Sequence, residues 1–239
     1  ARLSKFLQGH NIFGGFSTPA GLVEAFMGVL AETHPELIQP TPEDRRRWRD
    51  GEFRVARADV TRMYELPSRA DVRAWLRAAE HCAYLKHRGR GMLRNGTLYF
   101  AQHSRRSSFK AYCKADELEA GKGHGLPDDL EHAPELMEYA ENKLRAELVM
   151  RAMELKRRGL DFAANWMDTT GAELMNAICE GLTMSDMISL PTAELEKLKP
   201  RIVAVYHVWR EGHDFRAIYP KKTFYRYRAQ LLPLGVDIA

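Results

Sequence analysis

The sequence predicts an α+β fold: a central, mainly antiparallel sheet with packed helices over residues 1–160, followed by a helical part over residues 161–239. Segments that alternate apolar and polar residues, as half-buried strands do, lie before Gly159. Beyond it, apolar residues recur only at helical spacing. The 239 residues suffice for one large domain or for one domain with an appendage, and we expect the second.

The first third of the chain predicts strands and helices in alternation, at residues 3–13 (strand), 19–32 (helix), 53–64 (strand) and 69–84 (helix). Both helices follow a residue that favours the N-cap, Thr18 and Ser68. The prolines after the first helix are predicted to end it. In the second strand alternate side chains share a face, so Asp59 and Thr61 are expected on one side of the sheet.

The next two strands predict an antiparallel hairpin. A strand at residues 97–100 is followed, after a polar loop, by a strand that carries Tyr112. On an extended segment Lys110, Tyr112 and Lys114 share one face, so a tyrosine and two lysines would meet the same substrate. The alternative is a half-buried strand whose polar face is only solvated, and the pattern alone does not separate the two.

The second half of the chain begins with a turn-rich stretch at residues 121–134. Residues 136–158 then start as a helix. Residues 144–149 fit either a strand or a helix, and of the two we expect a strand through Glu147. All later segments predict helices, at residues 172–181, 193–209 and 222–232.

The distribution of charge says more than the net charge of +4, since the latter gives only a mildly basic field. Basic residues gather in runs at 45–49, 86–90, 105–106, 156–158 and 221–228. In the last run the cations are interleaved with aromatic rings, which can stack on unpaired bases. One such run is usually a solvated helix face. Several runs beside a candidate nucleophile favour nucleic acid as the partner.

The three cysteines, Cys82, Cys113 and Cys179, are far apart in the sequence. Their odd number and spacing fit neither a disulfide framework nor a Cys-x-x-Cys zinc site, so we expect a reducing cytoplasm. No run approaches the roughly 18 to 20 apolar residues that a membrane span needs. A membrane partner is therefore not expected.

A tyrosine among cations predicts attack on a phosphodiester. The hydroxyl of tyrosine has an ordinary pKa of about 10, so at neutral pH it needs nearby positive charge or a metal ion to act as a nucleophile. Lys110, Lys114, Arg105 and Arg106 could supply that charge around Tyr112. We expect its hydroxyl to be open to solvent and ringed by cations.

Such chemistry also calls for a divalent metal ion, and Mg²⁺ or Mn²⁺ would be held by carboxylates, with imidazole acceptable to Mn²⁺. The candidate ligands are Asp59 and Glu147 on strands, with Glu117 and His10 as weaker choices. An aspartate within a strand is more often a paired structural charge, and a histidine in a turn is more often a surface or capping residue.

Five segments resemble, in order, motifs of the rolling-circle replication initiators of filamentous bacteriophages, called gene II or replication-associated proteins. Residues 5–14 look like the K-x-L-Q-G-H-N-x-F-G signature of that family, and residues 56–61 look like its strand with an R-x-D-x-T element. The further likenesses lie at residues 104–117, 144–147 and 208–236, so the resemblance covers nearly the whole chain. The His-hydrophobic-His pair of the wider tyrosine-nickase superfamily is absent from the sequence.

The resemblance implies a metal-dependent endonuclease and strand-transferase with a tyrosine-nickase core over residues 1–160 and a DNA-binding helical region over residues 161–239. Such a protein works in the host bacterial cytoplasm. There it nicks the phage origin, keeps the new 5′ phosphate on a tyrosine and leaves a 3′ hydroxyl for the host polymerase. It later rejoins the displaced strand. A host helicase is a further expected partner.

Carried onto this chain, the resemblance makes Tyr112 the nucleophile and Lys114 the cation that stabilises the reacting phosphate. The DNA-binding residues would be Arg105, Arg106, Lys110, Lys221, Lys222, Arg226 and Arg228. The alternative is a DNA-binding module that recognises the origin without cutting it, with Tyr112 as a packed strand residue. A structural subunit without nucleic acid is a third and weaker hypothesis.

Overall fold

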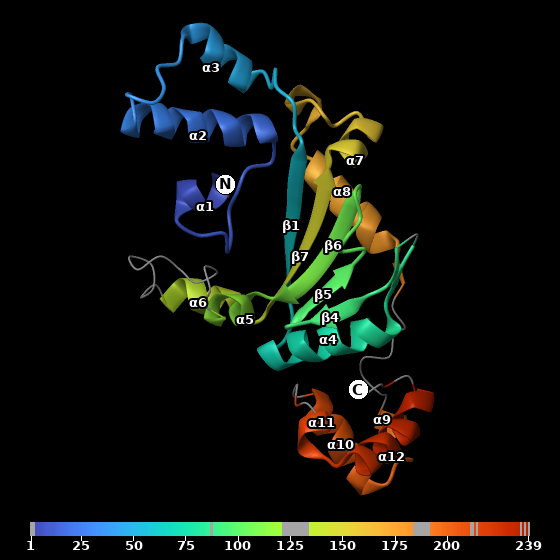
Figure 1. Cartoon of the computed structure of the whole chain (residues 1–239). Coiled ribbons are helices and arrows are strands. Elements are labelled where there is room, and N and C mark those ends of the chain that lie inside the picture. Colours follow the sequence, from blue (N-terminus) through green and yellow to red (C-terminus); the bar gives the residue numbers. More distant parts are fainter. Residues whose placement is uncertain are drawn as a thin grey trace.

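A computed structural model describes residues 3–86, 88–120, 134–183, 192–210, 213, 215–234, 236 and 238, and its centre is a five-stranded sheet (Figure 1). The strands lie in the order β1 (Arg57–Glu65), β7 (Lys143–Arg151), β6 (Ser107–Cys113), β5 (Thr97–Phe100) and β4 (Met92–Arg94). Every neighbouring pair is antiparallel. The predicted α+β class, the hairpin that carries Tyr112 and the strand through Glu147 are confirmed.

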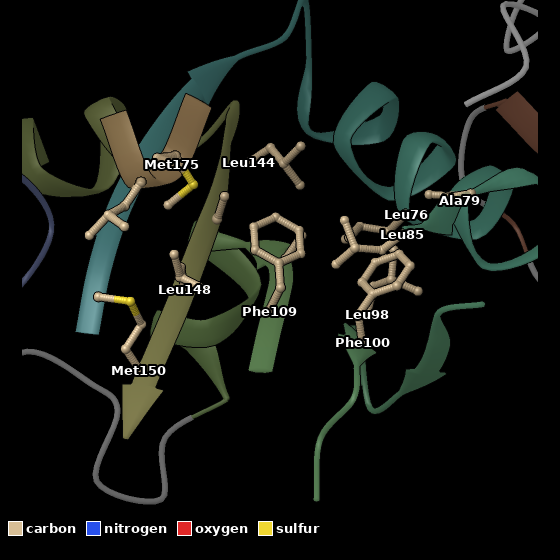
Figure 2. Packing of buried hydrophobic residues seen from close by; sticks show 14 of the residues in the cluster. Leu76, Ala79, Leu85, Leu98, Phe100, Phe109, Leu144, Leu148, Met150 and Met175 are labelled. Carbon is tan, nitrogen blue, oxygen red and sulfur yellow. The ribbon is translucent and has the colours of Figure 1, made fainter. Parts of the chain in front are cut away.

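The apolar face of the sheet forms the main core. Alternate residues of β5, β6 and β7, among them Leu98, Phe109 and Leu148, turn to this face and are buried. Two helices cover it, α4 (Arg69–Cys82) and α8 (Thr170–Glu180). Figure 2 shows the labelled side chains of this cluster, with those of α4 beside β5 and Met175 of α8 towards β7. The opposite face is thereby left to polar side chains.

The N-terminal segment is helical, so the strand predicted at residues 3–13 is wrong. Its helices are α1 (Leu3–Gln8), α2 (Pro19–Thr33) and α3 (Pro42–Arg49). A short apolar run fits either period, and here the ring of Phe6 packs against the ring of Phe26 in α2 at a centroid distance of 5.2 Å. Tertiary packing therefore decides for a helix.

The helix α2 was predicted, and the hydroxyl of Thr18 accepts a hydrogen bond from the backbone N–H of Gly21 at 3.2 Å. The helix α3 was missed, because Pro42 was interpreted as a helix end. Instead Pro42 occupies the first turn, and Thr41 and Asp44 form a reciprocal capping box in front of it.

Short elements connect the larger ones. Beside the main sheet lies a three-stranded one, β3 (Gly89–Arg90), β2 (Tyr84–Leu85) and β8 (Leu182–Thr183), and the short helices are α5 (Lys114–Glu119), α6 (Pro134–Ala140), α7 (Ala152–Arg157) and η1 (Ala163–Asn165). The predicted turn-rich stretch lies outside the described residues except for Pro134, which begins α6.

The C-terminal part has a core of its own. Its elements are α9 (Thr192–Leu195), α10 (Pro200–Arg210), α11 (Phe215–Ile218), α12 (Lys221–Leu231) and η2 (Leu232–Leu234). One helix was predicted over 193–209, but Pro200 lacks a backbone N–H and starts a new helix. The core includes Tyr206, Trp209 and Phe224, and Ala78 of α4 joins it to the sheet domain.

Residues 161–182 pack with the sheet, since Leu174 and Met175 of α8 belong to the first core. The described residues from Leu195 onward pack in the second core. The division at residue 160 stays a prediction. Within the described part of the chain, no helix combines the length and the apolar character needed to cross a membrane.

Gly51 provides a test of the packing between α3 and η1. Its φ is +70°, and an added Cβ would lie 2.4 Å from the backbone nitrogen of Ala164. We expect Gly51→Ala to lower the free energy of unfolding by about 3 kcal/mol, from left-handed strain plus overpacking. Urea unfolding measures this. The control is Gly96→Ala, which has φ +75° but no neighbour within 4 Å of the new Cβ and should cost only about 1 kcal/mol. Equal losses would contradict the role of the contact.

Candidate active site

The polar face of the sheet brings Tyr112 and Glu147 together. The register places Lys110 opposite Glu147 and Tyr112 opposite Arg145 on the neighbouring strands β6 and β7. Because side chains two apart in a strand share a face, all four point to the same side. The predicted sharing of a face by Lys110 and Tyr112 is confirmed, whereas β6 ends at Cys113 and Lys114 begins α5.

The carboxylate of Glu147 is the centre of this cluster. Its Oε1 accepts hydrogen bonds from the hydroxyl of Tyr112 at 2.5 Å and from Nε of Arg145 at 2.9 Å, and its Oε2 lies 2.6 Å from Nζ of Lys110. Burial opposes ionisation, but the charges of Lys110 and Arg145 outweigh it and hold the pKa of Glu147 at about 2. Glu147 is therefore ionised, and its carboxylate is contacted by three hydrogen-bond donors.

The ring of Tyr112 is buried, with 4% of its surface exposed, so our expectation of a hydroxyl open to solvent is wrong. Burial, and then the negative charge of Glu147, raise the pKa of Tyr112 well above its ordinary value. The ammonium of Lys110 lies 5.0 Å from the ring centroid. In this state the phenol keeps its proton and donates it to a hydrogen bond.

Lys114 reaches the same region from the first turn of α5. Its side chain is completely buried, and its Nζ donates to Oδ1 of Asn11 at 2.9 Å and pairs with Glu117. Burial lowers the pKa of Lys114, against the pull of Glu117. The predicted partnership of Lys114 with Tyr112 on one strand face is thus replaced by an approach from a helix end.

The loop after α1 lies over this end of the sheet. The guanidinium of Arg145 donates to the backbone oxygen of Asn11. Ile12 is buried with Leu118 of α5 and Leu136 of α6, and Figure 1 shows these helices at the end of β6 and β7 nearest α1. The loop is thereby tied to Arg145, the residue opposite Tyr112 on β7.

His10 belongs to this loop. Burial, and then the charge of Lys114, lower the pKa of His10, so its ring is neutral at pH 7. Its Nδ1 accepts a hydrogen bond from the backbone N–H of Ile12 at 3.3 Å. The predicted weaker ligands His10 and Glu117 therefore both neighbour Lys114.

Asp59 lies on the neighbouring strand β1, diagonal to Glu147 on the same face of the sheet. It lies opposite Val149, its carboxylate pairs with Arg57 at 2.7 Å, and its side chain is exposed. Each predicted carboxylate ligand is thus held by a cation, and among the described residues no three His, Cys, Asp or Glu side chains gather into a metal site. As they stand, these residues do not fit a bound divalent ion.

Arg105 and Arg106 precede β6, at its other end. Six residues of strand separate Arg106 from Tyr112, about 20 Å at the usual rise, so this arginine does not converge on the phenol. The cations beside Tyr112 are Lys110 and Arg145. Arg145 was not among the predicted site residues, although its position two residues before Glu147 on a strand was the available signal.

The C-terminal helix α12 exposes Lys221, Lys222 and Arg226. Of the aromatic residues interleaved with them, Phe224 and Tyr227 are buried in the second core, and Tyr225 is exposed. Two of the three rings are therefore unavailable for stacking on bases. The predicted role of these cations in DNA binding stays a prediction, as does that of Arg228.

Lowering the pH should destabilise the protein partly through Glu147. Its pKa is about 2 in the fold and 4.5 otherwise, so its stabilisation is present above pH 4.5 and is lost as the pH falls towards 2. The full contribution is on the order of 3 kcal/mol, and more than half is lost by pH 3. In urea unfolding, the difference in free energy of unfolding between wild type and Glu147→Gln should be smaller at pH 3 than at pH 6. A constant gap would contradict the lowered pKa.

Comparisons with known proteins identify two family regions in order along the chain. The family described as the N-terminal part of the gene II replication-associated protein matches residues 1–169, and its C-terminal counterpart matches residues 182–239. The replication-associated protein of Enterobacteria phage I2-2 is 35% identical over 237 residues, which cover 99% of this chain and 67% of that protein. No solved structure matches. Since both family regions match in order and the first spans well over half of the sequence, this chain belongs to the phage gene II replication-associated protein family.

Proposed function

We propose that this chain initiates phage DNA replication by nicking one strand of the origin through Tyr112 and later rejoining the displaced strand. Membership of the gene II replication-associated protein family supports a role in replication. The observation that carries the chemistry is the hydrogen bond from Tyr112 to Glu147, with Lys110 and Arg145 on the same carboxylate. Phosphoryl transfer depends mainly on such positioning and on fixed charge.

In the proposed reaction, the hydroxyl oxygen of Tyr112 attacks the scissile phosphorus and the bond from phosphorus to the 3′ oxygen breaks. The phenolic proton ends on the leaving 3′ oxygen, which leaves a 5′ phosphotyrosine and a 3′ hydroxyl. Rejoining is the same exchange in reverse. With a pKa of about 2, Glu147 is a weak base, so it orients the phenol and takes up its proton only as the new bond forms.

Lys110 and Arg145 are the cations that would stabilise the phosphate as charge develops on it. Both are tied to Glu147, and Arg145 is also tied to the backbone of Asn11. DNA reaches Tyr112 only when the loop that contains Asn11 moves aside. The same movement would release donors of Arg145 and Lys114 for the phosphate oxygens.

We further propose that the reaction needs Mg²⁺ or Mn²⁺. Magnesium sites in phosphoryl-transfer enzymes often use one or two carboxylates together with substrate phosphates. Asp59 and Glu147 lie on adjacent strands and face the same side of the sheet, which favours them over His10 and Glu117, but they would serve as ligands only after their ion pairs with Arg57 and Lys110 open. No step above is assigned to the ion.

The expected setting is the host bacterial cytoplasm, where host polymerase would extend the 3′ hydroxyl and a host helicase would unwind the duplex. The second candidate function is origin binding without cleavage. The burial of Tyr112 favours it, since a packed tyrosine needs no catalytic role.

Tyr112→Phe should abolish the covalent product, because no other group replaces the attacking oxygen. The measurement incubates the protein with supercoiled origin DNA and Mn²⁺, then detects open circles with protein on the 5′ end. Tyr99→Phe is the matched control. Tyr99 lies opposite Lys110 on β5, shares the polar face, and should nick as wild type does. Covalent product from Tyr112→Phe would exclude it as the nucleophile.

Chelation of divalent ions with EDTA should stop nicking, and added Mg²⁺ or Mn²⁺ should restore it. Asp59→Ala and Glu147→Ala should abolish nicking yet keep duplex affinity within a few-fold of wild type, because phosphate contacts elsewhere supply most of the binding. Asp161→Ala is the control, since this carboxylate pairs with Arg54 away from Glu147. An unchanged cleavage rate in either test variant would exclude that residue as a ligand.

A further inference from the structure

Three guanidinium groups contact one carboxylate at the end of the sheet away from Tyr112, and a fourth lies within electrostatic reach of it. Glu154 of α7 is buried, and it accepts hydrogen bonds from Arg157 and from Arg158, the latter at 2.8 Å. Nε of Arg106, just before β6, lies 3.3 Å from the same carboxylate. Figure 1 shows α5 and α7 at opposite ends of the sheet, so this cluster and Tyr112 are well separated.

The fourth guanidinium belongs to Arg88, in the turn between β2 and β3. It donates to the hydroxyl of Ser107 at 2.7 Å, while its other terminal nitrogen is buried and has no hydrogen-bond partner among the described residues. Arg88 lies within electrostatic reach of Glu154 and Arg158. A guanidinium with an unused donor is a group that an anion would satisfy.

The balance of charge separates this cluster from the basic run at residues 45–49. Glu154 is the one carboxylate for three paired arginines and the nearby Arg88. These cations hold the pKa of Glu154 at about 2, and the largest effect is the hydrogen bond from Arg157. The run at residues 45–49 has the opposite balance, since Arg46 contacts Glu43, Asp50 and Glu52. Only the first arrangement retains a surplus of cations for a phosphate.

We propose that Arg88, Arg106, Arg157 and Arg158, arranged by Glu154, form a second site that binds a phosphate of the DNA backbone. We call these four residues the arginine cluster. The inference rests on the proposed function, because it takes the nicked DNA as the ligand. Arg106 lies about 20 Å along the strand from Tyr112, which corresponds to about six phosphates of one strand in a duplex.

Glu154 acts as a positioning residue in this site. Its two oxygens fix Arg157 and Arg158 by their Nε or terminal nitrogens, which leaves further N–H donors of each guanidinium for phosphate oxygens. The cluster would hold the DNA backbone while Tyr112 meets the scissile phosphate. A merely structural cluster would tie α7 to β6 and leave DNA affinity untouched.

The test is the salt dependence of DNA binding, measured by fluorescence anisotropy with a labelled duplex in the Tyr112→Phe background, so that no covalent product forms. The test variant is Arg106→Gln with Arg157→Gln, whose side chains are 52% and 54% exposed. The slope of log affinity against log salt should decrease by about 1 for each arginine that contacts a phosphate. The control, Arg46→Gln with Arg47→Gln, removes the same charge from exposed positions and should leave the slope unchanged.

A second variant, Arg106→Lys with Arg157→Lys, keeps the charge and should keep the slope while it loses the paired donors. If the glutamine variant binds with the same affinity and slope as the control, or if lysine and glutamine lower the slope equally, the proposal is overturned. If the double glutamine variant does not fold, the single variant Arg106→Gln tests the proposal by the same comparison of affinity and slope. Nicking by the protein that retains Tyr112 is scored separately, so loss of the phosphate site and failure of the nuclease proposal give different results.

Discussion

The buried carboxylate of Glu147 is the constraint on which the polar face of the sheet depends. An ion removed from water costs several kcal/mol unless charges and hydrogen bonds replace the lost solvent. Lys110, Arg145 and Tyr112 provide that replacement from two strands. A slip of one residue between β6 and β7 would turn the partners to the apolar face, so the ion cluster and the strand register support each other. The residues proposed for chemistry are thus also the ones that make this sheet face stable.

The same constraint accounts for the closed state of the site. Arg145 and Lys114 have more donors than their carboxylate partners use, and Asn11 satisfies one donor of each through its backbone and side-chain oxygens. Ile12 adds apolar contact to α5 and α6. The motif at residues 5–14 therefore has a physical role, which is to cover the end of β6. Closure keeps the proton on Tyr112, and the approach of a phosphate would offer the displaced donors a new acceptor.

The sequence predicted correctly those parts of the fold that depend on residues close together in the chain. The N-caps at Thr18 and Ser68 and the hairpin that carries Tyr112 were readable because each involves neighbours in sequence. The helix α1 was not, since a short apolar run has no unique period and its partner lies in α2. Lys114 left the strand because a helix begins after Cys113. The periodicity of a sequence does not reveal which distant residues will pack together.

Charge balance explains how a mildly basic protein could separate binding from chemistry. At Glu147 the donors of Lys110 and Arg145 are occupied by one carboxylate and a loop oxygen, so in the proposed mechanism they would become available to a phosphate only when those contacts open. At Glu154 guanidinium groups outnumber the carboxylate and Arg106 and Arg157 remain about half exposed, so the surplus is open to a ligand at once. In the sequence Arg88, Arg106, Arg157 and Arg158 lie in basic runs, whereas Lys110 and Arg145 do not. Whether a cation can bind a phosphate depends on the groups that fold against it. Exposed cations at one end of β6 and occupied ones at the other would let the protein hold DNA before it cuts.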